Sequence, residues 1–164
     1  MTNNDHPNAD TMLPEGISIR GATADDTGSV LPLVNALGEG DEAKRSEIFR
    51  ELLGNPLYNA YVAVDGDEVV GFVDLWELPD LVHEGRIGYV MTVVVGPGWW
   101  GKGIGGALLQ QVLEVAAGKG LSEMHVSTEK DNVRAKKLYA RMGFKAESLL
   151  LEWSREDGAG DKRE

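Results

Sequence analysis

The stretch VVVGPGWWGKGIGGALL, from Val93 to Leu109, decides how the rest of the sequence is interpreted. Its three valines predict the end of a β-strand, and the apolar residues that close it predict the start of a helix. Between them, seven of the eleven residues from Gly96 to Gly106 are Gly or Pro. A glycine-rich turn from strand to helix leaves backbone N–H groups without partners at the positive end of a helix. The stretch therefore predicts a phosphate-bearing ligand.

Two nucleotide-binding patterns overlap in this turn. Gly101, Gly103 and Gly106 have the G-x-G-x-x-G spacing of dinucleotide-binding loops, and Glu129 follows roughly where such proteins hold a ribose. Residues 96–102 also spell most of a P-loop, but Gly103 stands where Ser or Thr would bind magnesium. A tight turn that only lets a helix pack closely on a strand is the structural alternative. The remaining sequence has to decide among them.

Length and composition predict one globular domain. The chain has 164 residues, of which 42% are hydrophobic and 26% charged. No apolar run reaches the ~20 residues of a membrane span, and the first 16 residues lack the apolar segment of a signal peptide, so we expect a cytoplasmic protein. Cysteine is absent and the three histidines are scattered, so we expect no disulfide, no thiolate and no metal site.

The charge is strongly negative. The net charge is −11, and the two ends contribute only −3 (residues 1–16) and −1 (residues 154–164), which leaves −7 on the body. Such a surface disfavours nucleic-acid backbones and anionic membranes as partners. It would attract cationic amines, or it serves solubility alone.

Residues 17–153 are expected to form the folded domain, between a disordered N-terminal tail (1–16) and a charged C-terminal tail (154–164). The first expected helix runs from about Asp25 to Leu37, with Ser29 as N-cap so that Pro32 lies in its first turn. The other expected elements are a strand at 17–21, a helix at 42–53, a hairpin of strands at 58–64 and 69–76, a polar connector at 77–85, a strand at 86–95, a helix from Ile104, a strand at 124–128, a helix capped by Asp131 or Asn132 and ended by Gly143, and two short strands within 144–153.

Two motifs stand in a fixed order along this domain. The turn fits the loop R/Q-x-x-G-x-G/A, with Trp100 where Arg or Gln is usual. One helix and one strand later, N-x-x-A-x-x-L-Y-x-x-x-G-F begins at Asn132. Together they resemble the GNAT superfamily, the general-control-related N-acetyltransferases, over roughly residues 17–153. A dinucleotide-binding domain remains as an alternative, but it would need several more parallel strands.

The resemblance implies a fold and a cofactor. The fold is α/β (α+β), with a GNAT-like mixed, mostly antiparallel sheet of six or seven strands flanked by about four helices. The cofactor is acetyl-coenzyme A, whose pantetheine arm pairs with the strand before the loop and whose pyrophosphate binds the loop. Asn132 would bond the cofactor, or act only as a helix cap. The implied cofactor-binding residues are Val93, Val94, Val95, Trp100, Gly101, Lys102, Gly103, Ile104, Gly105, Gly106 and Asn132.

Trp100 is the departure from the family pattern, and its cost should be one charge-assisted contact to the cofactor, which Lys102 would offset. We expect the adjacent pair Trp99 and Trp100 to pack beneath the loop. Flanking the cofactor or a partner surface is the alternative for this pair.

The implied reaction is direct attack of an amine on the thioester, in a complex that holds both substrates. Tyr139 matches the family tyrosine that protonates the leaving thiolate, although its position also suits core packing. Where relatives carry a carboxylate as general base, this chain has Tyr89 and Thr92. The remaining candidates for the base are a water molecule and four residues of the connector, namely Glu77, Asp80, His83 and Glu84.

The acceptor cannot be read from the sequence beyond its class. A small cationic amine and an amine of a protein or peptide both fit, and family members often form homodimers. A non-catalytic acyl-coenzyme-A-binding or regulatory module on the same fold is the competing interpretation, favoured if no base exists, because fold alone does not separate the two.

Overall fold

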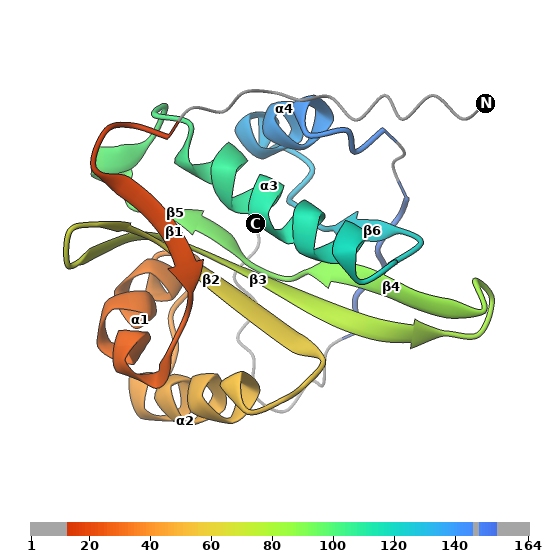
Figure 1. The fold of residues 1–164 in the computed structure, drawn as a ribbon, viewed down its shortest axis with the longest axis horizontal. Coiled ribbons are helices and arrows are strands. Elements are labelled where there is room, and N and C mark those ends of the chain that lie inside the picture. Colours follow the sequence, from red (N-terminus) through yellow and green to blue (C-terminus); the bar gives the residue numbers. More distant parts are fainter. Residues whose placement is uncertain (1–12, 146–147, 154–164) are drawn as a thin grey trace.

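The computed structural model describes residues 13–145 and 148–153 (Figure 1). Within them, six strands form one sheet in the order β1-β2-β3-β4-β6, and β5 pairs with β3 beyond β4. All pairs are antiparallel except β4 with β6, which confirms the expected mixed, mostly antiparallel sheet. The strands are β1 (Ile17–Gly21), β2 (Tyr58–Asp65), β3 (Glu68–Asp80), β4 (Gly85–Val90), β5 (Val93–Val95) and β6 (Met124–Val126). The helices are α1 (Thr27–Asn35), α2 (Glu42–Leu53), α3 (Ile104–Gly118) and α4 (Val133–Arg141), with 3-10 turns at Ala24–Asp26 and Pro97–Trp99.

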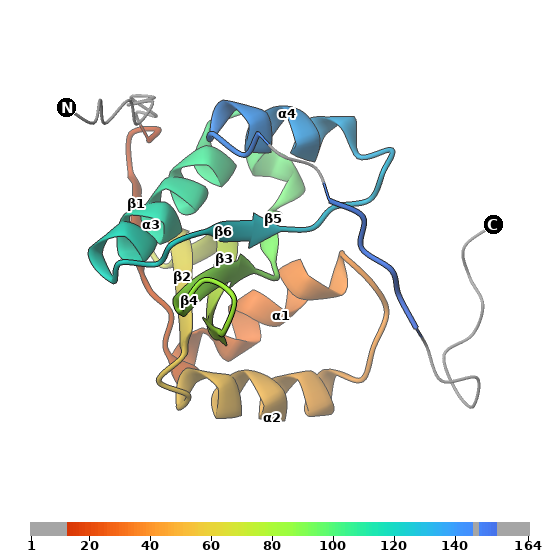
Figure 2. The same cartoon turned by 90° about the vertical axis from the view of Figure 1, so that its right-hand side faces the viewer.

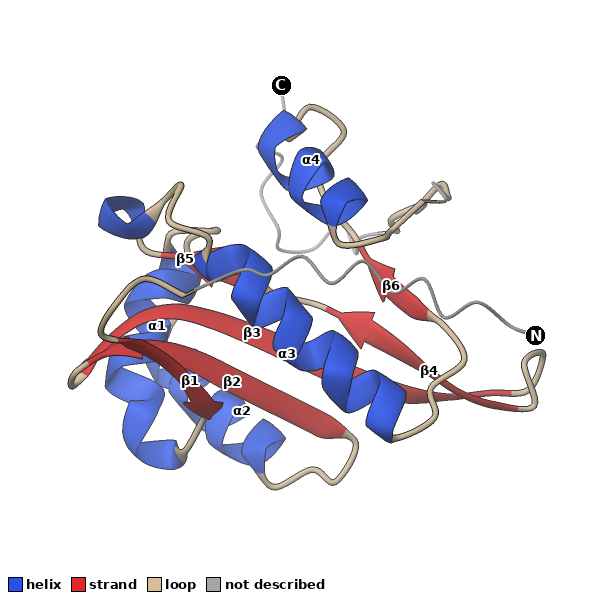
Figure 3. Cartoon of the chain, turned by 45° about the horizontal axis from the view of Figure 1, so that its top comes forward, coloured by secondary structure: helices blue, strands red, loops and turns tan. Residues whose placement is uncertain are grey.

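The two faces of the sheet carry different helices. Figures 2 and 3 show α3 lying across one face and α1 with α2 on the other, with α4 beside the N-terminal half of α3. Alternate residues of β3 face the two layers, as the two-residue period of a strand requires. Val73 and Leu75 join the buried cluster that includes Leu108 of α3, while Phe72 joins the cluster on the α1 and α2 side. The sheet is thus buried on both faces.

The first helix begins earlier than the sequence predicts. It starts at Thr27, with Asp26 as its N-cap, so the expected cap at Ser29 is wrong and Pro32 lies inside the helix. Pro32 has no N–H to donate to the carbonyl four residues back. The helix forms despite this because its face is buried, with Val30 and Leu31 almost fully covered. Tertiary packing here outweighs the local preference.

Two further expectations need correction. The connector expected at 77–85 is shorter, because β3 continues to Asp80 and β4 begins at Gly85. The two strands expected within 144–153 are absent from the part of that segment that the structure describes, residues 144–145 and 148–153. The sequence of residues 144–153 lacks the turn residues that fix a hairpin.

The expected tails fall mostly outside the described residues, which exclude 1–12 and 154–164. At the N-terminal side, Leu13 packs against the α3-side core, so order begins before residue 17. Across the described chain, every helix is too short or too polar to cross a membrane.

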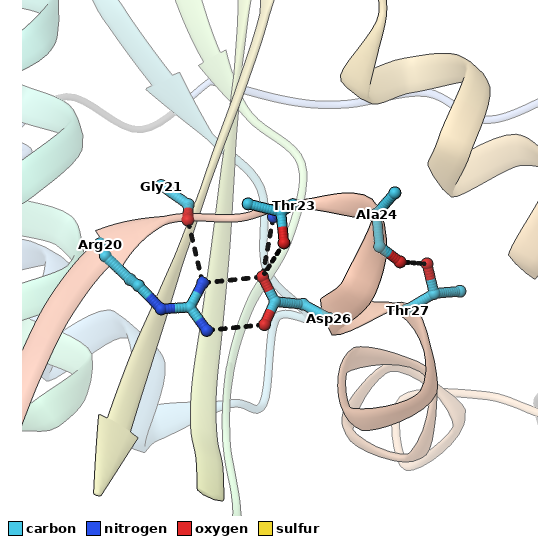
Figure 4. A network of polar contacts seen from close by, with 6 residues as sticks. All are labelled: Arg20, Gly21, Thr23, Ala24, Asp26 and Thr27. Atoms are coloured by element: carbon cyan, nitrogen blue, oxygen red, sulfur yellow. Dashed lines mark hydrogen bonds and ion pairs between the residues drawn. The ribbon is translucent and has the colours of Figure 1, made fainter. Parts of the chain in front are cut away.

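A network of polar contacts fixes the link from β1 to α1 (Figure 4). The guanidinium of Arg20 donates to both carboxylate oxygens of Asp26, at 2.8 and 2.7 Å, and the backbone N–H of Thr23 donates to Oδ2 at 2.7 Å. The hydrogen bond from Arg20 is the main cause that lowers the pKa of Asp26 to about 2, against the opposing effect of burial. The carboxylate therefore stabilises the fold in its ionised form.

Replacing Asp26 with Asn should destabilise the domain in a pH-dependent way. Arg20 is half exposed, so we expect a loss of only about 1–2 kcal/mol in the free energy of unfolding at pH 7. The pKa is lower in the folded than in the unfolded state, so this contribution is present above pH ~4 and disappears as the pH falls toward 2. Urea unfolding of both proteins at pH 7 and pH 2.5 measures the effect. An equal difference at both pH values would contradict it.

Candidate functional site

The strand that leads into the glycine turn is broken by a bulge. Trp76 of β3 is opposite Tyr89 of β4, whereas Val73 is opposite Val93 of β5, so two residues of β3 face three residues of the other chain segment. The extra residue bends the strand at 90–92. The long strand expected at 86–95 is therefore two strands, β4 and β5.

The bulge opens one edge of the sheet. Before it, β4 pairs with both β3 and β6; after it, β5 pairs with β3 alone. On the β3 side, the Thr92 carbonyl accepts from the Asp74 N–H and the Gly96 N–H donates to Val70. Because these groups alternate along a strand, the N–H and C=O groups of Val93 and Val95 face the open edge. Such an edge can accept an added strand or a strand-like ligand.

The glycine turn continues from this edge to the start of α3. Gly101 and Gly103 have φ of 76° and 83°, values that favour glycine, and Gly103 is the N-cap of α3 with no side-chain cap. The first N–H groups of α3 have no partner within the helix. A Cβ on Gly105 would come within 3.3 Å of Leu138 of α4, so this glycine also serves close helix packing. The turn fits a pyrophosphate, because its backbone is bare and its N–H groups are available.

The two tryptophans of the turn separate. Trp99 is partly buried against the core, as expected, but Trp100 is 55% exposed, so the expectation that it packs beneath the loop is wrong. The Trp100 indole N–H donates to the Val95 carbonyl at 2.7 Å, which places the ring over the open edge. The guanidinium of Arg134 lies 4.8 Å from the centre of the Trp100 ring. Lys102 lies over Trp99 at 4.3 Å, so two cations flank the turn.

Helix α4 brings the second motif next to the first. Asn132 caps it, accepting from the Ala135 N–H at 3.0 Å, which confirms one of the two expected caps. Tyr139 is half-buried and packs against the same core cluster as Val93 and Val95. Its ring meets Phe144 edge-to-face at 5.9 Å, and burial raises the pKa of its hydroxyl. In the described residues this hydroxyl has no hydrogen-bond partner, so it is available to a ligand.

Three of the four connector residues, Asp80, His83 and Glu84, lie away from the bulge. Asp80 pairs with Gly85 at the far end of β4, and six residues at about 3.3 Å each put this end roughly 20 Å from the bulge. There, His83 contacts Asp80 and Glu123, and the hydrogen bond that the His83 ring donates to Asp80 is the main cause that raises the pKa of His83. Glu84, in the same turn, has a positive φ of 53°. The structure does not bring these three residues to the open edge.

Glu77 is a buried ion-pair residue of β3, not a solvated connector residue. Its carboxylate is 3% exposed and accepts from Lys119, from Asn59 at 3.0 Å and from Arg86 at 3.3 Å. Burial raises its pKa, but the hydrogen bonds and the two positive charges outweigh burial and leave the pKa of Glu77 below its usual value. A carboxylate with this many donors is a poor proton acceptor.

Comparison with known proteins decides the family. The sequence profile described as "Acetyltransferase (GNAT) family" matches residues 31–144. The chain belongs to the GNAT acetyltransferase family. It is 33% identical to the N-alpha-acetyltransferase RimI of Mycobacterium tuberculosis over 153 residues, covering 91% of both chains. It is 31% identical to the thialysine N-epsilon-acetyltransferase of Bos taurus over 145 residues, covering 77% of this chain and 83% of the relative.

A solved structure agrees at the level of the fold. The crystal structure of a transcriptional regulator from Bacillus halodurans superposes with a TM-score of 0.78 at 23% identity, and the match covers 85% of this chain and 99% of that chain. The GNAT family implies acetyl-coenzyme A as acetyl donor and an amine as acceptor.

One residue at the bulge of this GNAT chain was not predicted from the sequence. Asp74 lies in the buried strand β3, with 5% exposure, and its carboxylate accepts from the N–H groups of Met91 and Thr92. The sequence does contain a signal, since Asp74 is the one charged residue in the apolar run from Val69 to Trp76. A buried charged residue without a partner is costly, so its presence predicts a specific polar contact.

Proposed function

We propose that this GNAT N-acetyltransferase moves the acetyl group to a primary amine by direct attack in a ternary complex. The observation that carries the proposal is the continuity of the site: the open edge of β5 runs into the glycine turn at the start of α3, and Tyr139 packs on the same core cluster as Val93 and Val95. Acetyl-coenzyme A supplies an activated thioester. The chain supplies orientation, a polarising N–H and a proton.

The binding roles follow from the free backbone groups. We assign the C=O of Val93 and the N–H of Val95 to the pantetheine arm, with Val94 holding β5 to β3 on the opposite side. The Val95 carbonyl is engaged by Trp100, so the arm has one acceptor fewer unless the indole moves. The turn from Gly101 to Gly106 would hold the pyrophosphate, with Ile104, Gly105 and Gly106 offering helix N–H groups. Lys102 would add a charge that Trp100 lacks, and Asn132 would bond the cofactor beside its capping role.

The catalytic roles are assigned by chemistry. A backbone N–H at Val93 would stabilise negative charge that develops on the thioester carbonyl. The Tyr139 hydroxyl would protonate the leaving thiolate, because its raised pKa keeps the proton at neutral pH. We assign the general base to water, since Glu77 is ion-paired and the other three connector candidates lie at the far end of β4.

The proposed acceptor is a small cationic amine or an amine of a protein or peptide. The printed names of two relatives give thialysine and an N-alpha amine as the acetylated groups. The charge of −7 on the body favours a positively charged acceptor. We also propose that residues 17–153 form the catalytic domain and that the protein acts in the cytoplasm, either alone or as a homodimer.

A panel of amines tests the acceptor class. The native protein is supplied with acetyl-coenzyme A and, in separate reactions, thialysine, polyamines, an aminoglycoside and peptides with free N-termini, and thiol release is followed. For a cationic acceptor, kcat/KM should fall several-fold between 50 mM and 500 mM salt, as the screening length shortens below about 10 Å. A salt-independent kcat/KM would leave the negative charge without a role in acceptor binding. Tight coenzyme A binding with no thiol release for any amine would favour the non-catalytic module.

A further inference from the structure

The side chain of Asp74 makes contacts that strand pairing does not require. Its Oδ1 atom accepts two backbone N–H groups at the bulge, from Met91 at 3.1 Å and from Thr92 at 2.7 Å. Its Oδ2 atom accepts from the Tyr58 hydroxyl at 3.0 Å, in a buried bond. Its own N–H donates to the Thr92 carbonyl at 3.1 Å. The bulge is therefore held to β3 by three hydrogen bonds to one residue.

The bulge determines where Val93 faces. Between Tyr89 and Val93 the strand changes register by one residue, and this change turns the Val93 N–H away from β3 and toward the open edge. At a bulge the ladder leaves N–H groups without strand partners, and buried N–H groups need an acceptor. The carboxylate of Asp74 fills this need for Met91 and Thr92. Without it, nothing else described in the structure would hold these two N–H groups in place.

We propose that Asp74 is the positioning residue of the acetyl-transfer site: its carboxylate holds the Met91–Thr92 bulge and so aims the Val93 N–H at the thioester carbonyl. This inference rests on the proposed binding of the thioester at the open edge of β5. Asp74 itself does not touch the substrates, because it is buried behind the bulge.

The ionised form of Asp74 holds the bulge more firmly than the neutral form. Bonds from N–H groups to a carboxylate are roughly twice as strong as those to a neutral acceptor. Burial raises the pKa of Asp74 to about 6, although the bonds from Thr92, Tyr58 and Met91 oppose this rise. The clamp should therefore be complete above pH 7 and should weaken as the pH falls through 6.

The surroundings of Asp74 leave Tyr58 as its titratable neighbour. Ala60 of β2 is directly opposite, and Phe72 and Trp76 flank it on its own strand and face. Helices α1 and α2 contribute apolar side chains to the cluster on this side, Val30 and Phe49 among them. Burial raises the pKa of Tyr58, so its hydroxyl stays protonated and keeps donating to Asp74 across the working range.

The first experiment observes the clamp directly, without any ligand. In ¹⁵N-labelled native protein, the amide signals of Met91 and Thr92 should move between pH 5 and pH 8 with a midpoint near 6. In Asp74→Asn this titration should disappear. In Tyr58→Phe the midpoint should rise, because the hydroxyl bond that favours the ionised form is gone. Amide signals that titrate identically in Asp74→Asn and native protein would overturn the assignment.

The second experiment connects the clamp to turnover. With acetyl-coenzyme A and the panel amine that the native protein acetylates fastest, Asp74→Asn should be about tenfold to a hundredfold slower in kcat at pH 8. The ratio of native to variant rates should fall toward one by pH 5, and this ratio cancels the ionisation of the amine itself. Coenzyme A affinity should change less than threefold. Asp67→Asn, an exposed carboxylate at the β2–β3 turn, is the control and should match native protein throughout.

The outcomes separate the clamp from the function on which it rests. A pH-independent rate ratio, or a loss confined to coenzyme A affinity, would show that Asp74 is only structural and would overturn the proposal. Amides that titrate through Asp74 in a protein with no turnover would instead overturn the proposed function. Asp74→Asn keeps an oxygen acceptor of the same shape. The circular dichroism and urea midpoint of this variant test whether a slow variant is folded.

Discussion

Replacing Gly103 with Val is expected to weaken coenzyme A binding by at least about a hundredfold, which corresponds to about 2.7 kcal/mol of binding free energy. Gly103 has a φ of 83° at the N-cap of α3, in the middle of the proposed pyrophosphate turn. A Cβ there holds the backbone away from phosphate oxygens, and valine also resists a left-handed φ. The turn would shift and its N–H groups would no longer converge. Calorimetry with coenzyme A measures the loss.

A matched variant separates this effect from strain. Gly120 also has a positive φ, 68°, and a Cβ at that position has open space. It lies just past the C-terminal end of α3, so Gly120→Val imposes similar strain about 20 Å from the turn. Gly120→Val should bind coenzyme A like native protein, with a similar loss of stability. Equal weakening in both variants would mean that strain in α3, not the phosphate contact, controls binding, and unchanged affinity in Gly103→Val would remove the turn from the site.

The fold was largely predictable because its signals are local. The apolar stripes of α3 and the caps at Gly54, Asn132 and Gly143 depend on neighbouring residues, and the observed helix ends follow them closely. Helix α1 was harder to predict, because Pro32 is a strong local signal against a helix and the burial of Val30 outweighs this signal. Helix propensity predicts little where tertiary packing opposes it, and that packing depends on the whole fold.

The parts of the candidate site that consist of contiguous backbone could be predicted from the sequence. The parts that depend on the pairing register of the strands could not. The glycine turn and α4 are contiguous motifs, so their spacing identifies them. The bulge arises from the pairing of β3 with two strands, and no spacing within residues 86–95 reveals where the register shifts. For the same reason, the sequence did not reveal the contacts of Glu77 and Asp74, which are three residues apart in one strand. Glu77 faces Lys119, the C-cap of α3, while Asp74 faces the opposite layer and the bulge.

Replacing Tyr139 with Phe is expected to slow turnover by roughly 10²–10⁴-fold while leaving the fold and coenzyme A affinity nearly unchanged. The Phe ring keeps the edge-to-face contact with Phe144 and the packing on the core cluster. The hydroxyl has no partner in the described residues, so its removal leaves no buried group unpaired and should cost little stability. Steady-state thiol release, calorimetry with coenzyme A and urea unfolding measure the three quantities.

The pH profile distinguishes acid catalysis from packing at this residue. Because burial raises the pKa of Tyr139 above the ordinary phenol value of about 10, the rate that depends on its proton should persist to higher pH than a solvated phenol would allow. In Tyr139→Phe this alkaline limb should vanish together with most of the rate. A packing role predicts the reverse, an active Phe variant with the native profile, and then water would have to protonate the thiolate.

Tyr61→Phe is the matched control, since Tyr61 is a partly buried tyrosine on β2 that packs against the same core cluster and belongs to neither motif. Its rate and its alkaline limb should equal those of native protein, so that a change at Tyr139 alone assigns the proton to its hydroxyl.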